Sequence, residues 1–231
     1  MNSKPIIGVI GKVQPKYEDD LWHRIDEVDE IRYLIVKNGG IPIVLLPTEK
    51  TLVFNDNDIK DEKMLNGEEI CDLKKQIDLC DGFILQGGLF SCNYEIEIAK
   101  MVLEQDKPLL GICAGFNNIL RALGTDVVED KSNSHNYYDI NYRHKINIDV
   151  DSQLYNIVGQ KNIEVNSIHS MIAPKEMVNS YAKISSYSED GLVESFEVPN
   201  KRFVMGIKWH PELMLNEKYV DKLFNTLINK C

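Results

Sequence analysis

Residues 108–116 read PLLGICAGF, and this stretch indicates the fold of the chain. Its apolar start predicts a buried strand, and residues 116–123 have the spacing of a helix. Glycines two positions before and two positions after Cys113 allow a sharp turn that lifts the thiol clear of the sheet. Amides and the dipole at a helix start stabilise a thiolate, the attacking form of cysteine. The alternative is a buried cysteine that ends a core strand, with glycines that serve packing alone.

Strands and helices alternate on both sides of this turn. The expected strands are 5–10, 41–46, 83–85 and 109–112, and the expected helices cover 25–35, 70–77 and 98–103. Continuously apolar strands that alternate with helices are typical of a parallel sheet covered by helices on both faces. The predicted fold class is therefore α/β, with a doubly wound and mostly parallel sheet.

The second half of the chain changes character. Residues 145–150 alternate between polar and apolar, and Asp190-Gly191 predicts a hairpin turn between two further strands. These further strands are expected at 163–168, 181–186, 192–198 and 203–209. We expect them to add antiparallel strands to the same sheet. Because no linker or repeat divides the sequence, residues 1–231 are expected to form a single domain.

The composition is acidic, with 36 Asp and Glu against 26 Lys and Arg and a formal net charge of −10. No basic stripe offsets this charge, which argues against nucleic acid and anionic membranes as partners. The polar run 55–69 is expected to be a solvated surface segment. No run approaches the ~20 apolar residues of a membrane span, and no signal-peptide pattern is present. The five cysteines include no C-x-x-C pair, which argues against disulfides and structural zinc. We therefore expect a cytoplasmic protein.

The tripeptide His210-Pro211-Glu212 follows the last predicted strand. In extended backbone, residues two apart point the same way, and Pro211 favours extended backbone at His210. Glu212 is therefore expected to bind one imidazole nitrogen of His210 and to leave the other as a base. A lone histidine beside an acid is more often a surface or capping residue. Together with Cys113, however, the motif supplies a nucleophile, a base and the acid that orients it.

An acyl-transfer site also needs donors for a developing oxyanion. The backbone amide of Ala114 is one candidate. The second residue of the Gly87-Gly88 pair is the other, since a glycine lets a ligand approach the backbone closely. This pair and Cys113 both follow predicted strands, and open parallel sheets bind ligands beyond such carboxyl ends. We therefore expect both to face one cleft.

Several motifs carry a family resemblance. They are the Gly87-Gly88 pair, GICAG at 111–115 and HPE at 210–212, supported by NGGIP at 38–42, VNSIH at 165–169, EDGLVE at 189–194 and MGIKWHPE at 205–212. In this order and separation they resemble the class I glutamine amidotransferase-like superfamily, and most closely its gamma-glutamyl-gamma-aminobutyrate hydrolase branch. The similarity runs from about Lys4 to the end of the chain.

The resemblance implies a flavodoxin-like sheet and a set of catalytic roles. Cys113 would be the nucleophile, His210 the base and Glu212 its partner, with Gly88 and Ala114 as the oxyanion hole. The implied reaction is hydrolysis of a gamma-glutamyl amide bond through a gamma-glutamyl thioester, which water releases as glutamate. It needs no metal and no organic cofactor.

The sequence departs from the family pattern around the pocket. The family usually has Arg or Leu directly after the nucleophile and Gln four residues after it, where this chain has Ala114 and Asn117. After the double glycine the branch usually has Asp and Pro, where this chain has Leu89 and Phe90. The resemblance therefore supports the reaction type more than the substrate. The substrate-binding residues that it implies are Gly87, Asn117, His169 and Ser170. For His169, a structural histidine at a strand end is the alternative.

Other polar residues favour plainer interpretations. His135 and His144 lie in a stretch rich in Asn and Tyr, which favours a solvated loop over metal ligation. Glu194 is either a substrate contact or a carboxylate on the surface of a strand. We therefore predict no metal site.

Two further functions remain open. A glutaminase subunit would use the same chemistry at Cys113 and pass ammonia to a separate synthetase. A non-catalytic ligand-binding member of the fold is compatible with Ala114 and Asn117, although the Cys-His-Glu set argues against it. The expected partner is a small-molecule gamma-glutamyl substrate, and a homodimer or a synthetase complex is open as well.

Overall fold

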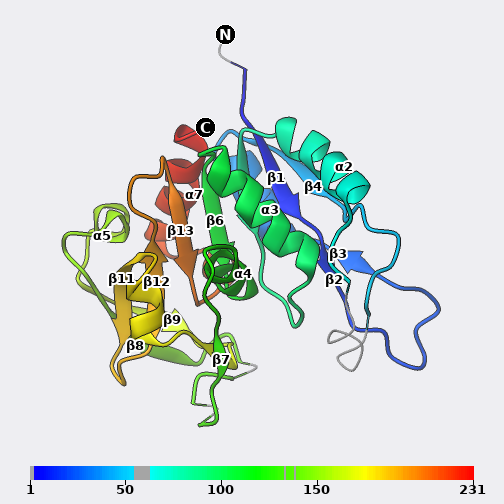
Figure 1. Cartoon of the computed structure of the whole chain (residues 1–231). Coiled ribbons are helices and arrows are strands. Elements are labelled where there is room, and N and C mark those ends of the chain that lie inside the picture. Colours follow the sequence, from blue (N-terminus) through cyan, green and yellow to red (C-terminus); the bar gives the residue numbers. More distant parts are fainter. Residues whose placement is uncertain (1–2, 55–62, 133, 138) are drawn as a thin grey trace.

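A nine-stranded sheet runs through the computed structural model, which describes residues 3–54, 63–132, 134–137 and 139–231 (Figure 1). Its strands are β1 (Ile6–Ile10), β4 (Ile41–Leu45), β5 (Gly82–Leu85), β6 (Leu109–Ile112), β8 (Arg143–Ile148), β9 (Asn162–Asn166), β11 (Lys183–Ser188), β12 (Val193–Glu197) and β13 (Val204–Ile207). They lie in the order β4-β1-β5-β6-β13-β12-β11-β8-β9. Two short pairs lie outside this sheet: β2 (Lys12–Val13) with β3 (Ile25–Asp26), and β7 (Val128–Glu129) with β10 (Met171–Ile172).

The first five strands in this order, β4, β1, β5, β6 and β13, are parallel. β4 lies on one side of β1, whereas β5, β6 and β13 follow on the other side. This is the flavodoxin-like order of a doubly wound sheet, in which ligands bind beyond the carboxyl ends of the strands. The predicted fold class is therefore confirmed.

The direction of β13 corrects one prediction. The sequence groups residues 203–209 with the antiparallel strands, but β13 pairs in parallel with β6 and antiparallel with β12. All four residues of β13 are buried, and an apolar run of this kind does not encode the direction of its partner. The register pairs Ile207 with Ile112, so both strands end at the same edge, directly before Lys208 and Cys113. β12, β11, β8 and β9 pair antiparallel, with Asp190-Gly191 between β11 and β12, as predicted.

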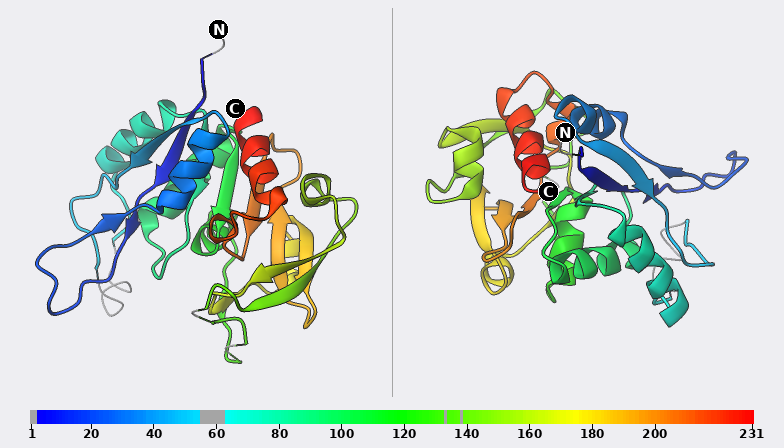
Figure 2. Two further views of the ribbon diagram at one scale, coloured as in Figure 1. Left: turned by 180° about the vertical axis from the view of Figure 1, so that it is seen from behind. Right: turned by 90° about the horizontal axis from the view of Figure 1, so that it is seen from above.

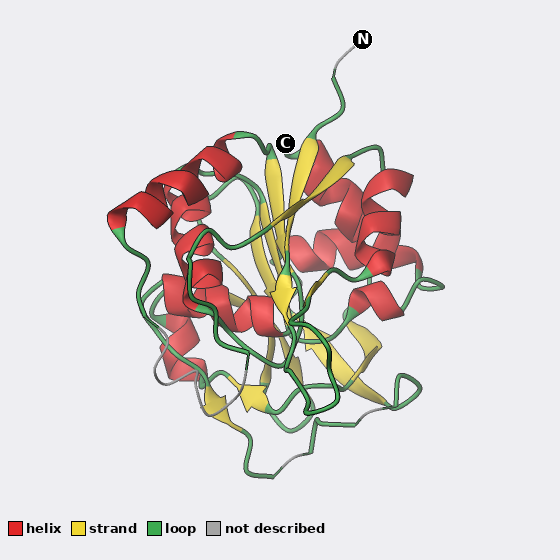
Figure 3. Ribbon diagram, turned by 90° about the vertical axis from the view of Figure 1, so that its right-hand side faces the viewer, coloured by secondary structure: helices red, strands yellow, loops and turns green. Residues whose placement is uncertain are grey.

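Helices cover both faces of the sheet (Figures 2 and 3). α1 (Asp29–Lys37), α5 (Gln153–Val158) and α7 (Lys218–Asn229) pack together on one face, and α2 (Gly67–Asp78), α3 (Asn93–Glu104) and α4 (Ala114–Ala122) pack in a row on the other. The short α6 (Lys175–Asn179) contacts β11. Each face has its own core. In β5, for example, Phe83 and Leu85 belong to one core and Ile84 to the other, which explains why the parallel strands are apolar throughout.

Local differences from the predicted elements have simple causes. Ile25 was expected in the first helix, but it lies in β3 and pairs with Val13, and α1 begins only at Asp29. α2 begins earlier than expected because Asn66 and Glu69 form a capping box. Within the described residues, no helix combines the length and apolar character needed to span a membrane.

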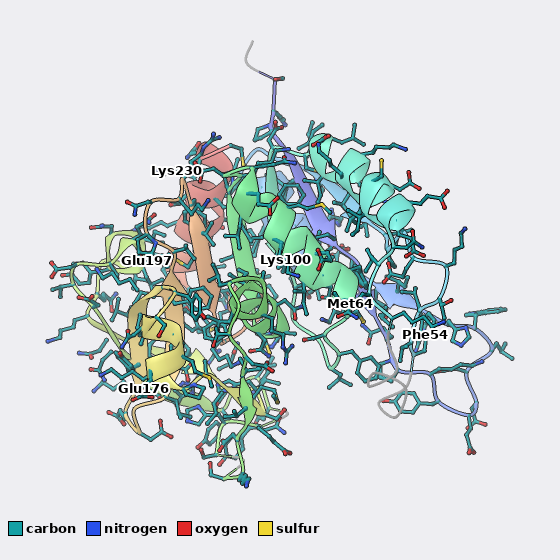
Figure 4. All side chains as sticks on the ribbon, in the orientation of Figure 1. Phe54, Met64, Lys100, Glu176, Glu197 and Lys230 are labelled. Carbon is teal, nitrogen blue, oxygen red and sulfur yellow. The ribbon has the colours of Figure 1, made fainter. Side chains whose placement is uncertain are left out.

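The predicted solvated run 55–69 falls only partly on described residues, since 55–62 lie outside them. Of the following residues, Lys63 and Met64 are exposed, and Leu65 is buried. Figure 4 shows the side chains of the described residues, with Met64 labelled.

Candidate active site

Cys113 lies at the turn between β6 and α4, where its backbone has φ 51° and ψ −99°. Two glycines permit this turn. A Cβ at Gly111 would lie 2.6 Å from the carbonyl oxygen of Gly115, and a Cβ at Gly115 would overlap the carbonyl oxygen of Leu85. The N–H of Cys113 donates to the carbonyl oxygen of Ile207 at 2.9 Å. The turn is therefore fixed against both neighbouring strands, β5 and β13.

His210 follows β13, and its Nδ1 lies 2.7 Å from Oε1 of Glu212. Asn166, at the end of β9, holds the backbone of His210 on both sides: its Oδ1 accepts from the His210 N–H at 2.8 Å, and its Nδ2 donates to the His210 carbonyl at 2.7 Å. A Cβ at Gly87 would lie 2.5 Å from Cε1 of His210 and 3.4 Å from Cβ of Cys113. The imidazole and the thiol residue therefore meet over this glycine.

The charges on His210 and Cys113 support each other. Burial alone would lower the pKa of His210, but Glu212 and the Cys113 thiolate raise it well above its ordinary value. Burial alone would raise the pKa of Cys113, but His210 and the ammonium of Lys208 lower it. The favoured form is therefore a thiolate beside an imidazolium.

The Gly87-Gly88 turn is held from below by a buried ion pair. Gly88 has a φ of 155°, and a Cβ there would lie 2.6 Å from Cε of Lys12. The Nζ of Lys12 donates to both carboxylate oxygens of Glu95, at 2.7 and 3.0 Å, and both side chains are buried. Glu95 also accepts from the N–H of Cys92 at 2.8 Å. Lys12 therefore fills the space beneath the turn and ties it to the start of α3.

A cavity of about 650 Å³ opens beside Cys113. Its volume falls within the usual range of small-molecule sites. Most of the predicted site residues line it, namely Gly88, Cys113, Ala114, Asn117, His169 and Ser170. Gly87 does not line it and instead lies under the imidazole of His210.

Lys208 is a lining residue that the sequence reasoning missed. It is buried, its Nζ donates to Oδ1 of Asn117 at 2.6 Å, and it lies 4.6 Å from the ring centroid of Phe116. Burial lowers its pKa to about 8, which leaves an ammonium at neutral pH. The alternation that predicts His210 and Glu212 on one side also includes Lys208, two residues before His210, so the signal was available.

Apart from the Cys113 thiolate, the charged lining residues of this cavity are cations. Lys208 and Arg121 line it, and no carboxylate is among the described lining residues. Arg121 pairs with Asp126 at 2.9 Å, whereas Lys208 has the neutral amide of Asn117 as its hydrogen-bond acceptor. The cavity therefore suits a ligand that carries a carboxylate.

The predictions for His135, His144 and Glu194 are wrong. His135 is buried rather than solvated, His144 lies in β8 with its side chain only 14 % exposed, and Glu194 is fully buried. Together with His169, the two histidines surround the Glu194 carboxylate. The polar composition of residues 131–144 does not predict that these histidines are buried, because it carries no information on the buried acid that they face.

The sheet order and the cysteine-bearing turn are those of the class I glutamine amidotransferase-like superfamily. The Peptidase C26 family matches residues 92–212, more than half of the chain, and the chain belongs to this family. It is a hydrolase that acts on carbon–nitrogen amide bonds.

Individual relatives agree with this assignment. The chain is 27% identical to a glutamine amidotransferase-like protein of Rickettsia prowazekii, over 99% of this chain and 98% of that protein. It is 26% identical to the gamma-glutamyl-gamma-aminobutyrate hydrolase PuuD of Escherichia coli, over 58% of each chain. The glutaminase domain of Trypanosoma brucei CTPS, solved with bound acivicin, shares the fold with a TM-score of 0.67 at 14% identity, over 98% of this chain and 94% of that one.

Proposed function

We propose that the protein hydrolyses a gamma-glutamyl amide bond, with Cys113 as nucleophile, His210 as base and Glu212 as the acid that orients it. One observation carries this proposal. The Cys113 thiol lies at the wall of a cavity that Lys208 and Arg121 also line, and the glutamate-bound imidazole of His210 lies beside Cys113 over Gly87. The similarity to a gamma-glutamyl hydrolase of Escherichia coli supports the gamma-glutamyl half of the substrate.

The reaction proceeds in two stages. The Cys113 thiolate attacks the amide carbonyl carbon, and the N–H groups of Gly88 and Ala114 donate to the oxyanion. The carbon–nitrogen bond then breaks, and the leaving amine takes a proton from the His210 imidazolium. Water next attacks the thioester and gives a proton to His210, after which glutamate leaves and the thiolate returns. The net change is one amide and one water converted to glutamate and an amine.

Lys208 binds the α-carboxylate of the gamma-glutamyl group in this proposal. Its ammonium lies on the cavity wall with Cys113, and Asn117 already accepts one of its three N–H bonds. A carboxylate would accept from the others. Hydrogen bonds to charged groups contribute about 1.5–3 kcal/mol, so Lys208→Met should lower kcat/KM roughly 10- to 100-fold. At a pH where Cys113 is a thiolate in both proteins, we expect most of this loss in KM, because the carboxylate is bound equally before and during the reaction. Loss of the ammonium should in addition raise the pKa of Cys113.

The test measures glutamate release from a panel of gamma-glutamyl amines, gamma-glutamyl peptides and free glutamine. We expect release by the native protein, its loss in Cys113→Ala, and normal release by Cys71→Ala, which removes an exposed thiol elsewhere. A diazo-ketone analogue of glutamine should add one mass increment at Cys113. Glutamine hydrolysis that appears only after a synthetase is added would contradict a stand-alone hydrolase. If the native protein releases no glutamate and is not labelled by any of these compounds, the non-catalytic alternative is supported instead.

A further inference from the structure

Three histidines surround one buried carboxylate beside the active-site cavity. Oε1 of Glu194 lies 3.2 Å from Nε2 of His144, 3.5 Å from Nδ1 of His135 and 3.5 Å from Nε2 of His169. These side chains are 0–14 % exposed. The nearest potential ligand atoms of His135, His144 and Glu194 all lie within 4.8 Å of one another. We propose that His135, His144, His169 and Glu194 form a zinc-binding site.

The imidazoles lie 3.2–3.5 Å from Glu194 Oε1 but form no well-aligned hydrogen bond with it. Neither carboxylate oxygen of Glu194 has a hydrogen-bond partner among the described residues, and the same holds for both ring nitrogens of His144 and His169. Buried polar atoms are almost always satisfied, and a buried carboxylate without a partner is especially unfavourable. Three unsatisfied nitrogens, Nδ1 of His135 and Nε2 of His144 and His169, face the same oxygen of Glu194, and this arrangement suits a cation among them.

His135 gives the clearest evidence for a cation. Its Nε2 lies 2.9 Å from Oδ2 of Asp190, so a neutral imidazole donates there and leaves a lone pair on Nδ1. That lone pair faces the Glu194 oxygen, which is also an acceptor, at 3.5 Å. Two facing acceptors repel each other unless the imidazole is doubly protonated or a metal cation lies between them. A carboxylate that holds the far nitrogen of a metal-binding histidine is a recurrent feature of zinc sites.

The distances and donor atoms favour Zn²⁺. With bonds of about 2.0–2.1 Å, the ligand atoms of a tetrahedral zinc ion are roughly 3.4 Å apart, which matches the distances from Glu194 to the three imidazoles. The imidazoles are farther from one another, and His169 lies outside the group whose ligand atoms are within 4.8 Å, so zinc would draw the rings together. Imidazole nitrogen suits zinc better than it suits Ca²⁺ or Mg²⁺, which prefer oxygen. Lys208 also lies close enough to act on Glu194, but its Nζ donates to Asn117.

Four buried protein ligands would make a structural rather than a catalytic site. The ligands come from β8, β12 and two loops, and the loops are already joined by a backbone hydrogen bond from the N–H of His169 to the carbonyl of His135 at 2.9 Å. His169 and the preceding Ile168 line the cavity, and the Ile168 carbonyl lies 3.7 Å from Sγ of Cys113. The metal would thus fix the cavity wall without contacting the reacting atoms.

The test uses an untagged Cys113→Ala protein, because the active-site thiol and imidazole are themselves able to bind zinc. The chelator-treated protein is titrated with Co²⁺ and then with Zn²⁺. We expect one equivalent of Co²⁺ with the intense visible bands of a tetrahedral nitrogen and oxygen site, and displacement by Zn²⁺. His144→Ala and Glu194→Gln should each weaken binding at least about 100-fold, because loss of a ligand should cost more than the 10- to 100-fold that loss of a residue orienting a ligand costs.

His23→Ala is the matched control. His23 is exposed and stacks on Phe54 with 4.2 Å between ring centroids, and Figure 4 shows Phe54 beside β3, on the other side of the molecule from β8 and β12. This variant should bind as the parent does. If the ligand variants do not fold, ¹⁵N-histidine spectra of the parent decide. Zn²⁺ should shift His135, His144 and His169 and leave His23 and His210 unchanged. Absence of stoichiometric binding, a thiolate-to-cobalt band, or undiminished binding by the folded ligand variants would overturn the proposal.

Discussion

Cys113 has a backbone conformation that residues with side chains rarely adopt, since its φ is 51°. Such a strained backbone conformation persists only where several surrounding contacts hold it in place, and strained residues cluster at functional sites. Here the surroundings are the Ile207 carbonyl, which accepts from the Cys113 N–H, and the two glycines on either side. The strained residue is also the one whose pKa is lowered, so backbone and electrostatics act on the same thiol.

The reactivity of Cys113 should persist below the ordinary pKa of a thiol. Burial raises its pKa, but His210 and Lys208 lower it further than burial raises it, so the thiolate is lost only when pH falls through this lowered value. In His210→Ala the largest stabilising charge is gone, and the midpoint should move upward. The measurement is the alkylation rate of the Cys113 peptide by iodoacetamide across pH. Because the two groups titrate as a pair, the midpoint belongs to both.

A matched variant separates charge from packing in this experiment. His23→Ala removes an exposed imidazole and should leave the alkylation profile unchanged. An unchanged midpoint in a folded His210→Ala protein would contradict the thiolate–imidazolium form.

At the scale of elements, the site depends on the pairing of β6 with β13. The register of Ile112 with Ile207 brings the residues after both strands to one edge of the sheet. The sequence predicts both strands, because each is an apolar run before a recognisable motif. It does not predict that they are neighbours in parallel, because pairing direction depends on the connections between the strands and on what covers their faces.

Gly115→Ala should damage both the fold and the site. A Cβ at this position would overlap the carbonyl oxygen of Leu85, and neither backbone segment can rotate away as a flexible side chain would. α4 must therefore move away from β5 and carry Ala114 and Cys113 with it. Overpacking of this kind costs about 1–3 kcal/mol or more, which denaturant unfolding should detect. Glutamate release and Cys113 alkylation at neutral pH should fall as well.

Gly67→Ala is the control for a glycine without neighbours. Gly67 lies at the start of α2, and a Cβ there meets nothing within 4 Å. Stability should be unchanged or slightly higher. Equal stability and activity of the two alanine variants would show that the strand–helix contact at Gly115 tolerates a side chain.

At the scale of the whole molecule, the two halves of the chain contribute different parts of the site. The first half supplies Cys113 and the Gly87-Gly88 turn, and in the second half the residues after β13 supply His210 and Lys208. Sequence motifs predict Cys113, the Gly87-Gly88 turn and His210, because the spacing of residues within each motif reflects the local backbone geometry. That prediction omits Lys208. The histidine cluster was not predictable in this way. Its members are distant in sequence and meet only when β8, β12 and two loops fold around Glu194.

A substitution in the core covered by α7 should change the stability of the fold separately from the reactivity of the Cys113 thiol. Phe224 on α7 is fully buried against the sheet face opposite α4. Phe224→Ala should lower the free energy of unfolding by about 3–5 kcal/mol, because it leaves a cavity in a packed core. Lys222→Ala on the exposed side of the same helix should change it by less than about 0.5 kcal/mol. At temperatures well below the unfolding transition, both variants should keep the alkylation midpoint of Cys113, since neither residue contacts the site. A shifted midpoint in Phe224→Ala would mean that the core under α7 also sets the geometry of the thiol and the imidazole.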